Sequence, residues 1–304
     1  MLRQRIITAV ILFIVIIAAL WMGLWAFTAV AAIAMGACLW EWLRLAKWNN
    51  ALCLLIGFAA AVFFYWLEMF QPIDVNVLQS GNGLLIISSV GTVIWTVITC
   101  VVFFKRMSGW NVPNPLAWLS ALIFVPCAWF SLMFLYREYG AVYMISVLAI
   151  VWVADITAYF GGRALQGPKM ATGISPKKTW SGALTAVICV LVLSYVLYAV
   201  APQAPFWTNT IISKLTVFAS AAILFITVLF SIAGDLFESA VKRTAGVKDS
   251  SNLLLGHGGV YDRLDAQFAV LPLAVFILLF IQGLKLDEKS LNSWSNRFHR
   301  HQHH

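Results

Sequence analysis

Charge is scarce in this sequence, because only 11% of its 304 residues are Asp, Glu, Lys or Arg. An ordinary soluble domain carries roughly 25% charged residues. Hydrophobic residues make up 62%, and their runs are too long and too frequent for the core of a water-soluble protein. The composition therefore excludes a soluble enzyme. It also excludes a soluble basic domain that binds nucleic acid, although the formal net charge is +8.

Cysteine and histidine are also sparse. All five cysteines lie inside apolar runs and none forms a Cys-x-x-Cys pair, which indicates small buried hydrophobic side chains rather than a thiolate metal site. His257 is the only histidine before the C-terminal stretch "NRFHRHQHH". We expect the tail, residues 291–304, to be a solvated polar end; metal binding by its histidines is the alternative.

Long apolar runs are what the sequence has in abundance. A hydrocarbon core about 30 Å thick needs roughly 20 apolar residues per helix, and lipid-embedded backbone must satisfy its own hydrogen bonds. The sequence thus predicts an all-α, polytopic integral membrane protein with about nine transmembrane helices. They are expected near 6–25, 26–46, 51–67, 83–104, 116–136, 140–160, 181–201, 214–233 and 265–285.

The expected organisation is N-terminal transmembrane helices over 1–136, a C-terminal transmembrane catalytic region over 137–290, and the tail. The first apolar run exceeds the 7–15 residues of a signal-peptide core, so we expect it to be a retained span. With a cytoplasmic N-terminus, 14 of the 20 lysines and arginines fall on cytoplasmic segments, which the positive-inside rule favours. The basic tail falls on the opposite side of the membrane, which disagrees with this orientation.

Two charged, glycine-bearing loops, 161–180 and 234–264, are then cytoplasmic and are expected to form the site. At the start of the second, Asp235, Glu238 and Lys242 have the spacing of one helical face. Near its end, the spacing of Asp262 and Asp265 would also place them on one face of a helix. Carboxylates without thiolates suit a hard cation such as Mg²⁺, which leaves coordination positions for substrate phosphates.

The rest of the second loop suits a phosphate ligand. Glycines on both sides of His257, including Gly258 and Gly259, would let the backbone approach a ligand closely. Lysine and arginine side chains suit phosphate oxygens, and together with the carboxylates they describe a site for a di- or triphosphate. The alternative is a solvated interfacial loop with incidental ion pairs. The cations are Lys242, Arg243, Lys248 and Arg263.

The first loop offers a second set of charges. Asp155 lies inside an apolar run, where an ionisable group indicates function, unless a neighbouring cation merely neutralises it. The stretch "SPKKT" places Lys177 and Lys178 between the hydroxyls of Ser175 and Thr179. This arrangement predicts an anion clamp; binding of lipid headgroups is the alternative.

These residues carry a family resemblance. The run "SAVKRTAGVKDSSNLLLGHGGVYDRLD" (residues 239–265) resembles the signature of phosphatidate cytidylyltransferases, and "DITAYFGGR" and "SPKKTW" resemble that family in the same order. The resemblance covers the C-terminal half, while the N-terminal spans resemble the family only in being hydrophobic. Two positions depart from many members: Leu255, where a small residue or proline is common, and Ser181, where glutamate is common.

The resemblance implies that CTP and phosphatidate react to give CDP-diacylglycerol and pyrophosphate, with Mg²⁺ bound by Asp235 and Asp262. It implies catalytic roles for Asp235, Asp262, Lys178 and His257, the last either donating to a phosphate or holding the glycine loop. Asp155 and Arg163 are further candidates. Substrate-binding roles are expected for Ser175, Lys177, Lys178, Thr179, Lys242, Arg243, Lys248, Asp249, Gly258, Gly259, Arg263 and Asp265.

The expected location is the inner membrane of a bacterium, with membrane lipid as the surroundings and no nucleic-acid partner; a homodimer is left open. The main alternative function is an ion-coupled transporter, which Asp155 and the many spans would fit. The long charged loops fit it less well, since transport sites lie near the bilayer midplane. A CDP-alcohol phosphotransferase is disfavoured because its D-x2-D-G-x2-A-R motif is absent. A scaffold protein is a further alternative, in which the charged loops would have no catalytic role.

Overall fold

The structure is a computed structural model that describes residues 2–70, 83–104, 110–254 and 256–283, with side chains from residue 7 onward. Leu255 and the tail 291–304 lie outside these described parts. So do Lys105, Arg106 and the side chains of Arg3 and Arg5, four of the 14 basic residues predicted to be cytoplasmic. The elements are α1 (Leu2–Met22), α2 (Leu24–Leu45), α3 (Asn50–Phe70), α5 (Gly83–Phe104), α6 (Asn114–Phe134), η1 (Leu135–Tyr139), α7 (Ala141–Leu165), β1 (Lys169–Ala171), β2 (Ser175–Thr179), α8 (Trp180–Val200), α9 (Trp207–Lys214), α10 (Val217–Thr244), α11 (Tyr261–Leu264) and a C-terminal helix, Gln267–Gly283.

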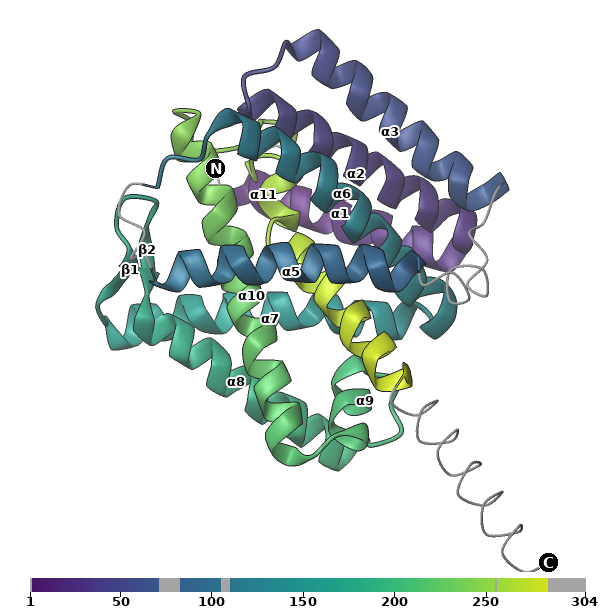
Figure 1. The fold of residues 1–304 in the computed structure, drawn as a ribbon, viewed down its shortest axis with the longest axis vertical. Helices are drawn as coiled ribbons and strands as arrows, with labels where there is room; N and C mark the ends of the chain where they lie inside the picture. The colour runs from purple at the N-terminus through teal and green to yellow at the C-terminus, as the bar shows by residue number, and fades with distance from the viewer. Residues whose placement is uncertain (1, 71–82, 105–109, 255, 284–304) are drawn as a thin grey trace, which may run out of the picture.

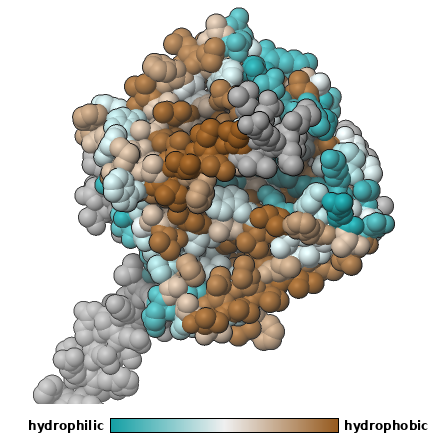
Figure 2. All heavy atoms as spheres, turned by 180° about the vertical axis from the view of Figure 1, so that it is seen from behind, coloured by the Kyte–Doolittle hydropathy of each residue, from teal (hydrophilic) through white to brown (hydrophobic). Residues whose placement is uncertain are grey.

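The helical membrane architecture is confirmed. Within the described residues, each predicted apolar run coincides with a helix, and seven helices are long and apolar enough to cross a membrane. The first and last, Ile7–Met22 and Gln267–Gly283, are shorter apolar helices, so the number of nine spans stays a prediction. In Figure 2 hydrophobic side chains cover much of the face in view, and hydrophilic side chains gather along its upper and right edges.

An aromatic core joins the two halves of the chain. Trp42 of α2 is fully buried and stacks on Tyr261 of α11, with ring centroids 4.2 Å apart and an interplanar angle of 18°. Phe124 of α6, Phe237 of α10 and Phe268 of the C-terminal helix pack around the same indole. Because large aromatic side chains bury much apolar area, this cluster fixes α2 against the C-terminal elements directly beneath the charged loops.

The first charged loop is shorter than predicted. Helix α7 continues to Leu165, and residues 169–179 form a two-stranded antiparallel sheet in which Lys169 pairs with Thr179 and Ala171 with Ser175. The hairpin is the one β-sheet within the described residues of this otherwise helical protein. Successive side chains of a strand face opposite ways, so Lys177 is exposed while Lys178 turns inward.

The second charged loop was predicted to start too early. Helix α10 runs to Thr244 instead of ending near residue 233, and it carries Asp235, Glu238 and Lys242 on its last three turns. Only the apolar span was predicted to end near residue 233, and the spacing of the three charged residues already indicated one helical face. Glu238 pairs with Lys242 and Asp235 pairs with Lys178, so the charges do not end the helix.

The charged connections meet at one end of the helices. The Val112 amide donates to Thr244 Oγ1 (2.9 Å), Arg243 Nε donates to the Ile174 carbonyl of the hairpin (3.2 Å), and the Arg44 guanidinium donates to the Ser250 carbonyl. In Figure 1 this end carries the β1–β2 hairpin and α11. Among the described residues, the end of α2, the hairpin and the segment after α10, all assigned to one side of the membrane, therefore share one end of the molecule. The division into regions 1–136 and 137–290 stays a prediction.

All five cysteines are free, and Cys38, Cys53 and Cys127 are buried as predicted. Cys189 is half-buried and Cys100 is exposed, because its side chain faces outward from α5.

Candidate active site

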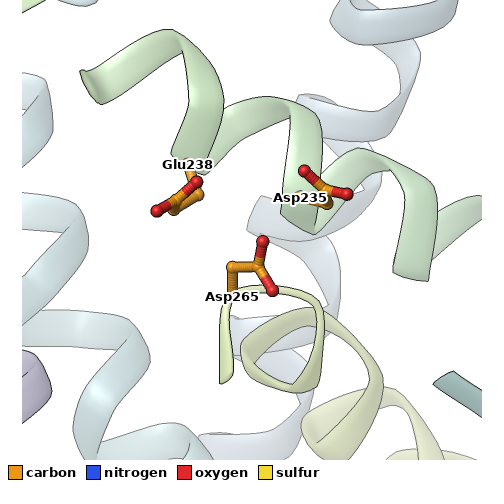
Figure 3. Close-up of side chains that lie close together, drawn as sticks. All are labelled: Asp235, Glu238 and Asp265. Atoms are coloured by element: carbon orange, nitrogen blue, oxygen red, sulfur yellow. The ribbon is translucent and has the colours of Figure 1, made fainter. Parts of the chain in front are cut away.

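Three carboxylates form a cluster at the charged end. Asp235 and Glu238 project from α10, and Asp265 projects from the turn between α11 and the C-terminal helix (Figure 3). One ligand oxygen from each lies within 4.8 Å of the others. Burial, followed by the nearby charges of Asp235 and Asp155, raises the pKa of Asp265 well above its usual value. Three carboxyl groups at this spacing repel one another unless a proton or a cation lies among them.

Gly234 allows this meeting of elements. A side chain there would collide with the backbone of Ala266, at 2.8 Å from its Cα, and with the Asp265 carbonyl oxygen, at 2.9 Å. The absent Cβ therefore lets α10 approach the turn closely enough for Asp265 to join Asp235 and Glu238.

The cluster fits a hard divalent cation. Glu238 is 1% exposed, and its Oε1 has no hydrogen-bond partner among the described residues. A buried, unpaired carboxylate oxygen is costly, and a bound cation would satisfy it. All three donors are carboxylate oxygens with no thiolate or imidazole among them, which is the donor set that Mg²⁺ prefers.

Lys178 approaches the cluster from the hairpin. Its Nζ lies 2.5 Å from Asp235 Oδ2, with both side chains mostly covered. Burial alone would lower the pKa of Lys178, but the charges of Asp235 and Asp155 outweigh it and raise that pKa above its usual value. Lys178 is therefore a cation at neutral pH, directly beside a candidate metal ligand.

Lys242 joins the cluster to Asp262. Its Nζ lies 2.7 Å from Glu238 Oε2 and 2.7 Å from Asp262 Oδ1. The other oxygen of Asp262 accepts hydrogen bonds from the amides of Ser250 (2.9 Å) and Gly259 (2.7 Å). Burial would raise the pKa of Asp262, but hydrogen bonding with Glu238, then with Lys242 and the Gly259 amide, lowers it to about 2. Asp262 thus holds the glycine loop as an anion, outside the group of three carboxylates, and its predicted metal role stays a prediction.

Comparison with known proteins agrees with this chemistry. The model of the cytidylyltransferase family matches residues 3–281. The chain belongs to the cytidylyltransferase family. Proteins named phosphatidate cytidylyltransferase are similar over nearly their whole length: that of Haemophilus influenzae is 32% identical over 92% of this chain and 100% of its own, and that of Pseudomonas aeruginosa 32% identical over 91% and 97%. That of Brucella abortus is 33% identical over 90% of this chain and 91% of its own.

The glycines of this cytidylyltransferase pack against carboxylates. Gly258 has a φ of +82°, which favours glycine, and a Cβ there would lie 2.5 Å from Asp262 Oδ2. Gly259 is buried, and a Cβ there would run into Ser250 Oγ and Glu41 Oε2. Protein side chains fill the space that a Cβ would take at these two positions, and the role of Gly258 and Gly259 in binding nucleotide phosphates stays a prediction.

Other predicted site residues lie around this network. Thr179 is buried and caps α8, accepting a hydrogen bond from the Gly182 amide (3.1 Å), and Ser175 is half-buried at the start of β2. Arg263 donates to the His257 carbonyl from Nε (3.1 Å) and Nη2 (2.6 Å), while His257 Nδ1 has no partner within the described structure. The remaining candidates are exposed: Asp155, Arg163, Lys177, Arg243, Lys248 and Asp249.

Ser181, one of the two departures, has a structural contact. Its Oγ accepts a hydrogen bond from the Gly167 amide (3.1 Å) and lies 3.1 Å from Thr179 Oγ1. The hydroxyl therefore ties the end of the hairpin to the segment that follows α7.

Sequence reasoning missed two carboxylates in this cytidylyltransferase. Glu238 was placed on the face of Asp235 but given no role, although it completes the cluster. Glu41 of α2 was not singled out at all, yet it is fully buried and accepts four hydrogen bonds from residues 250–261. The available signal was an acidic residue inside an apolar run, "CLWEWLR", the same kind of signal that drew attention to Asp155.

Proposed function

We propose that this protein transfers the cytidylyl group of CTP to phosphatidate, giving CDP-diacylglycerol and pyrophosphate. The observation that carries the proposal is the family match over residues 3–281, joined to the three-carboxylate cluster at one end of an apolar helical protein. The relatives' names give the substrate class, and the cluster gives the chemistry. The family match lends no support to the transporter alternative.

The reaction brings two anionic substrates, CTP and phosphatidate, into contact. A phosphate oxygen of phosphatidate attacks the α-phosphorus of CTP, a new P–O–P bond forms, and the bond to the β-phosphate oxygen breaks with loss of pyrophosphate. Phosphatidate is already an anion at neutral pH, so a strong general base is not needed. Catalysis of this kind rests on positioning and on neutralising charge.

We assign Asp235, Glu238 and Asp265 as the residues that would hold Mg²⁺, with Asp262 ordering the loop beside them. The ion, when bound, supplies positive charge to the substrate phosphates. We propose that Lys178 contacts a phosphate oxygen while still paired with Asp235, since an ammonium group has three donors. The exposed cations Lys177, Arg243, Lys248 and Arg263 are the proposed contacts for the rest of the triphosphate.

We further propose that the charged end faces the cytoplasm of a bacterium, where CTP is available, and that the lipid acyl chains stay in the inner membrane. The basic bias of the loops supports this orientation. A homodimer stays a prediction.

The test uses the purified full chain with phosphatidate, labelled CTP and Mg²⁺, and follows transfer of label into a lipid-soluble product. EDTA should abolish transfer and added Mg²⁺ restore it. Asp235→Asn should lower the rate about 10²–10³-fold, as loss of an electrostatic group at such sites does. The matched control is Glu138→Gln, an exposed carboxylate of η1 far along the chain from the cluster. Formation of no cytidine lipid by the parent protein would refute the proposal.

A further inference from the structure

Glu41 connects the N-terminal half of the chain to residues 250–261 of the family signature, here called the signature loop. Its Oε1 accepts hydrogen bonds from Ser251 Oγ (2.5 Å) and the Val260 amide (3.1 Å). Its Oε2 accepts from Ser250 Oγ (2.9 Å) and the Tyr261 amide (2.8 Å). Four donors on one fully buried side chain use both oxygens, so Glu41 acts here as an acceptor only, which is the behaviour of a carboxylate.

The contacts of α2 reach both ends of the loop. Ser250 and Ser251 stand at its start, and Val260 and Tyr261 stand at its end, where α11 begins. Arg44, one turn along α2, donates to the Ser250 carbonyl, and Trp42 stacks on Tyr261. Between the anchored ends, the described residues contain one isolated bridge, between Leu254 and Gly258, so the loop has little regular structure of its own.

The anchored end of the loop leads directly to the carboxylate cluster. Tyr261 opens the four-residue helix α11, which carries Asp262, and Asp265 follows immediately after it. Ser250 Oγ, which donates to Glu41, also lies 3.1 Å from Asp262 Oδ2. A displacement of the Val260 and Tyr261 amides therefore moves Asp262 and Asp265 relative to Asp235 and Glu238, which belong to a separate helix.

We propose that Glu41 is a positioning residue for the cytidylyl-transfer site, holding the start of α11 so that Asp265 stays within the carboxylate cluster. The inference rests on the proposed function for its effect on turnover, but not for its effect on loop order or on metal binding. Removing the acceptor leaves buried donors unpaired, and such donors destabilise the arrangement that buries them. Rehydration of these donors requires the loop that carries them to shift away from α2.

Glu41→Gln is the main test variant. It keeps the shape of the side chain but replaces one acceptor oxygen with an amide donor, so the two donors facing that atom lose their acceptor. The matched control is Glu68→Gln, which also removes a nearly buried carboxylate of the N-terminal half. Glu68 pairs with Arg137 at 2.7 Å and touches η1 rather than the loop.

Three measurements are made on the full chain in detergent. We expect the amides of residues 250–261 in Glu41→Gln to exchange hydrogen about tenfold faster or more, the effect of losing one or two hydrogen bonds to a charged group. We expect Mn²⁺, used as the probe ion, to bind about tenfold more weakly for the same reason. Turnover should need more Mg²⁺, with the KM for CTP little changed. Glu68→Gln should match the parent in all three.

Unchanged loop exchange and unchanged Mn²⁺ affinity in folded Glu41→Gln overturn the inference, whatever happens to turnover. If Glu41→Gln is not recovered folded, Ser251→Ala, which removes one of the four donors, is measured in its place, with the same expected direction and the same refuting result. A parent protein that binds Mn²⁺ but makes no cytidine lipid would refute the proposed function alone, because exchange and ion binding still test Glu41.

Discussion

Lys242 offers the sharpest test of the charge network. Its ammonium group contacts Glu238 Oε2 and Asp262 Oδ1, both at 2.7 Å, and the three side chains are 13%, 1% and 6% exposed. Lys242→Met keeps the length and the packing of the stem but removes the charge. It leaves two largely buried carboxylates facing each other without their shared cation.

The magnitude follows from this burial. Removing one partner of a buried ion pair costs about 3–5 kcal/mol, because an uncompensated charge stays inside. For a chain of this size each kcal/mol lowers the unfolding midpoint by about 2–4 °C, so Lys242→Met should unfold roughly 10 °C below the parent. The double variant Glu238→Gln/Lys242→Met removes one stranded charge and should recover part of the loss, a coupling of about 0.5–3 kcal/mol.

The assay is thermal unfolding of the purified protein in detergent, followed by intrinsic tryptophan fluorescence. Lys214→Met, an exposed lysine of α9, serves as the control for loss of one positive charge and should unfold like the parent. An unfolding midpoint for Lys242→Met within 2 °C or so of the parent would mean that the network contributes no more than a surface ion pair. Additive effects in the double variant would refute the shared cation.

Three further outcomes are expected. In chemical denaturation, Gly259→Ala should lower the free energy of unfolding by about 1–3 kcal/mol, because a methyl group there meets Ser250 and Glu41, and it should also weaken activity. The control Gly283→Ala should be neutral, since no atom lies within 4 Å of a Cβ at that position. Lys178→Ala should reduce transfer about 10–100-fold without loss of membrane insertion, with partial rescue by Lys178→Arg; parental kinetics would contradict its place beside Asp235. The pKa of Asp262 is about 2 in the folded protein and about 3.9 in the unfolded chain, so its contribution of about 2 kcal/mol to stability is present above pH 4 and lost between about pH 4 and pH 2. Asp262→Asn should remove this part of the acid-induced loss of stability. An unchanged dependence of stability on pH in that variant would contradict the lowered pKa of Asp262.

The helices could be predicted from the sequence, because lipid requires every membrane-spanning segment to form its backbone hydrogen bonds internally. Each apolar run had to satisfy its backbone internally, and each became a helix. The hairpin at 169–179 escaped prediction because "KMA" and "SPKKT" lack the alternation of a half-buried strand. Helix α10 continues to Thr244, past the apolar span predicted to end near residue 233, because Asp235, Glu238 and Lys242 find partners in the protein, which hydropathy cannot register.

The signature stretch and Asp235 directed attention to the end of the molecule that carries the carboxylate cluster, but the sequence did not show which side chains meet there. Whether Asp262 or Asp265 faces Asp235 depends on the turn after α11, and the spacing of the two residues alone does not decide it. Glu41 could not be paired with its donors from sequence, since they lie 209 to 220 residues further along the chain.

That separation has a consequence for biosynthesis. Ribosomes add about 5–20 residues per second, so Glu41 enters the membrane about 10–40 s before Ser250, 209 residues later, is made. Throughout that interval a carboxylate four residues from the end of α2 has none of its four final donors and must be solvated at the membrane surface. The last residues of the signature loop therefore close a bond network begun near the N-terminus. In a nascent chain halted before residue 261, α2 is fully synthesised, but the Glu41 carboxylate that the finished fold buries is still exposed to water.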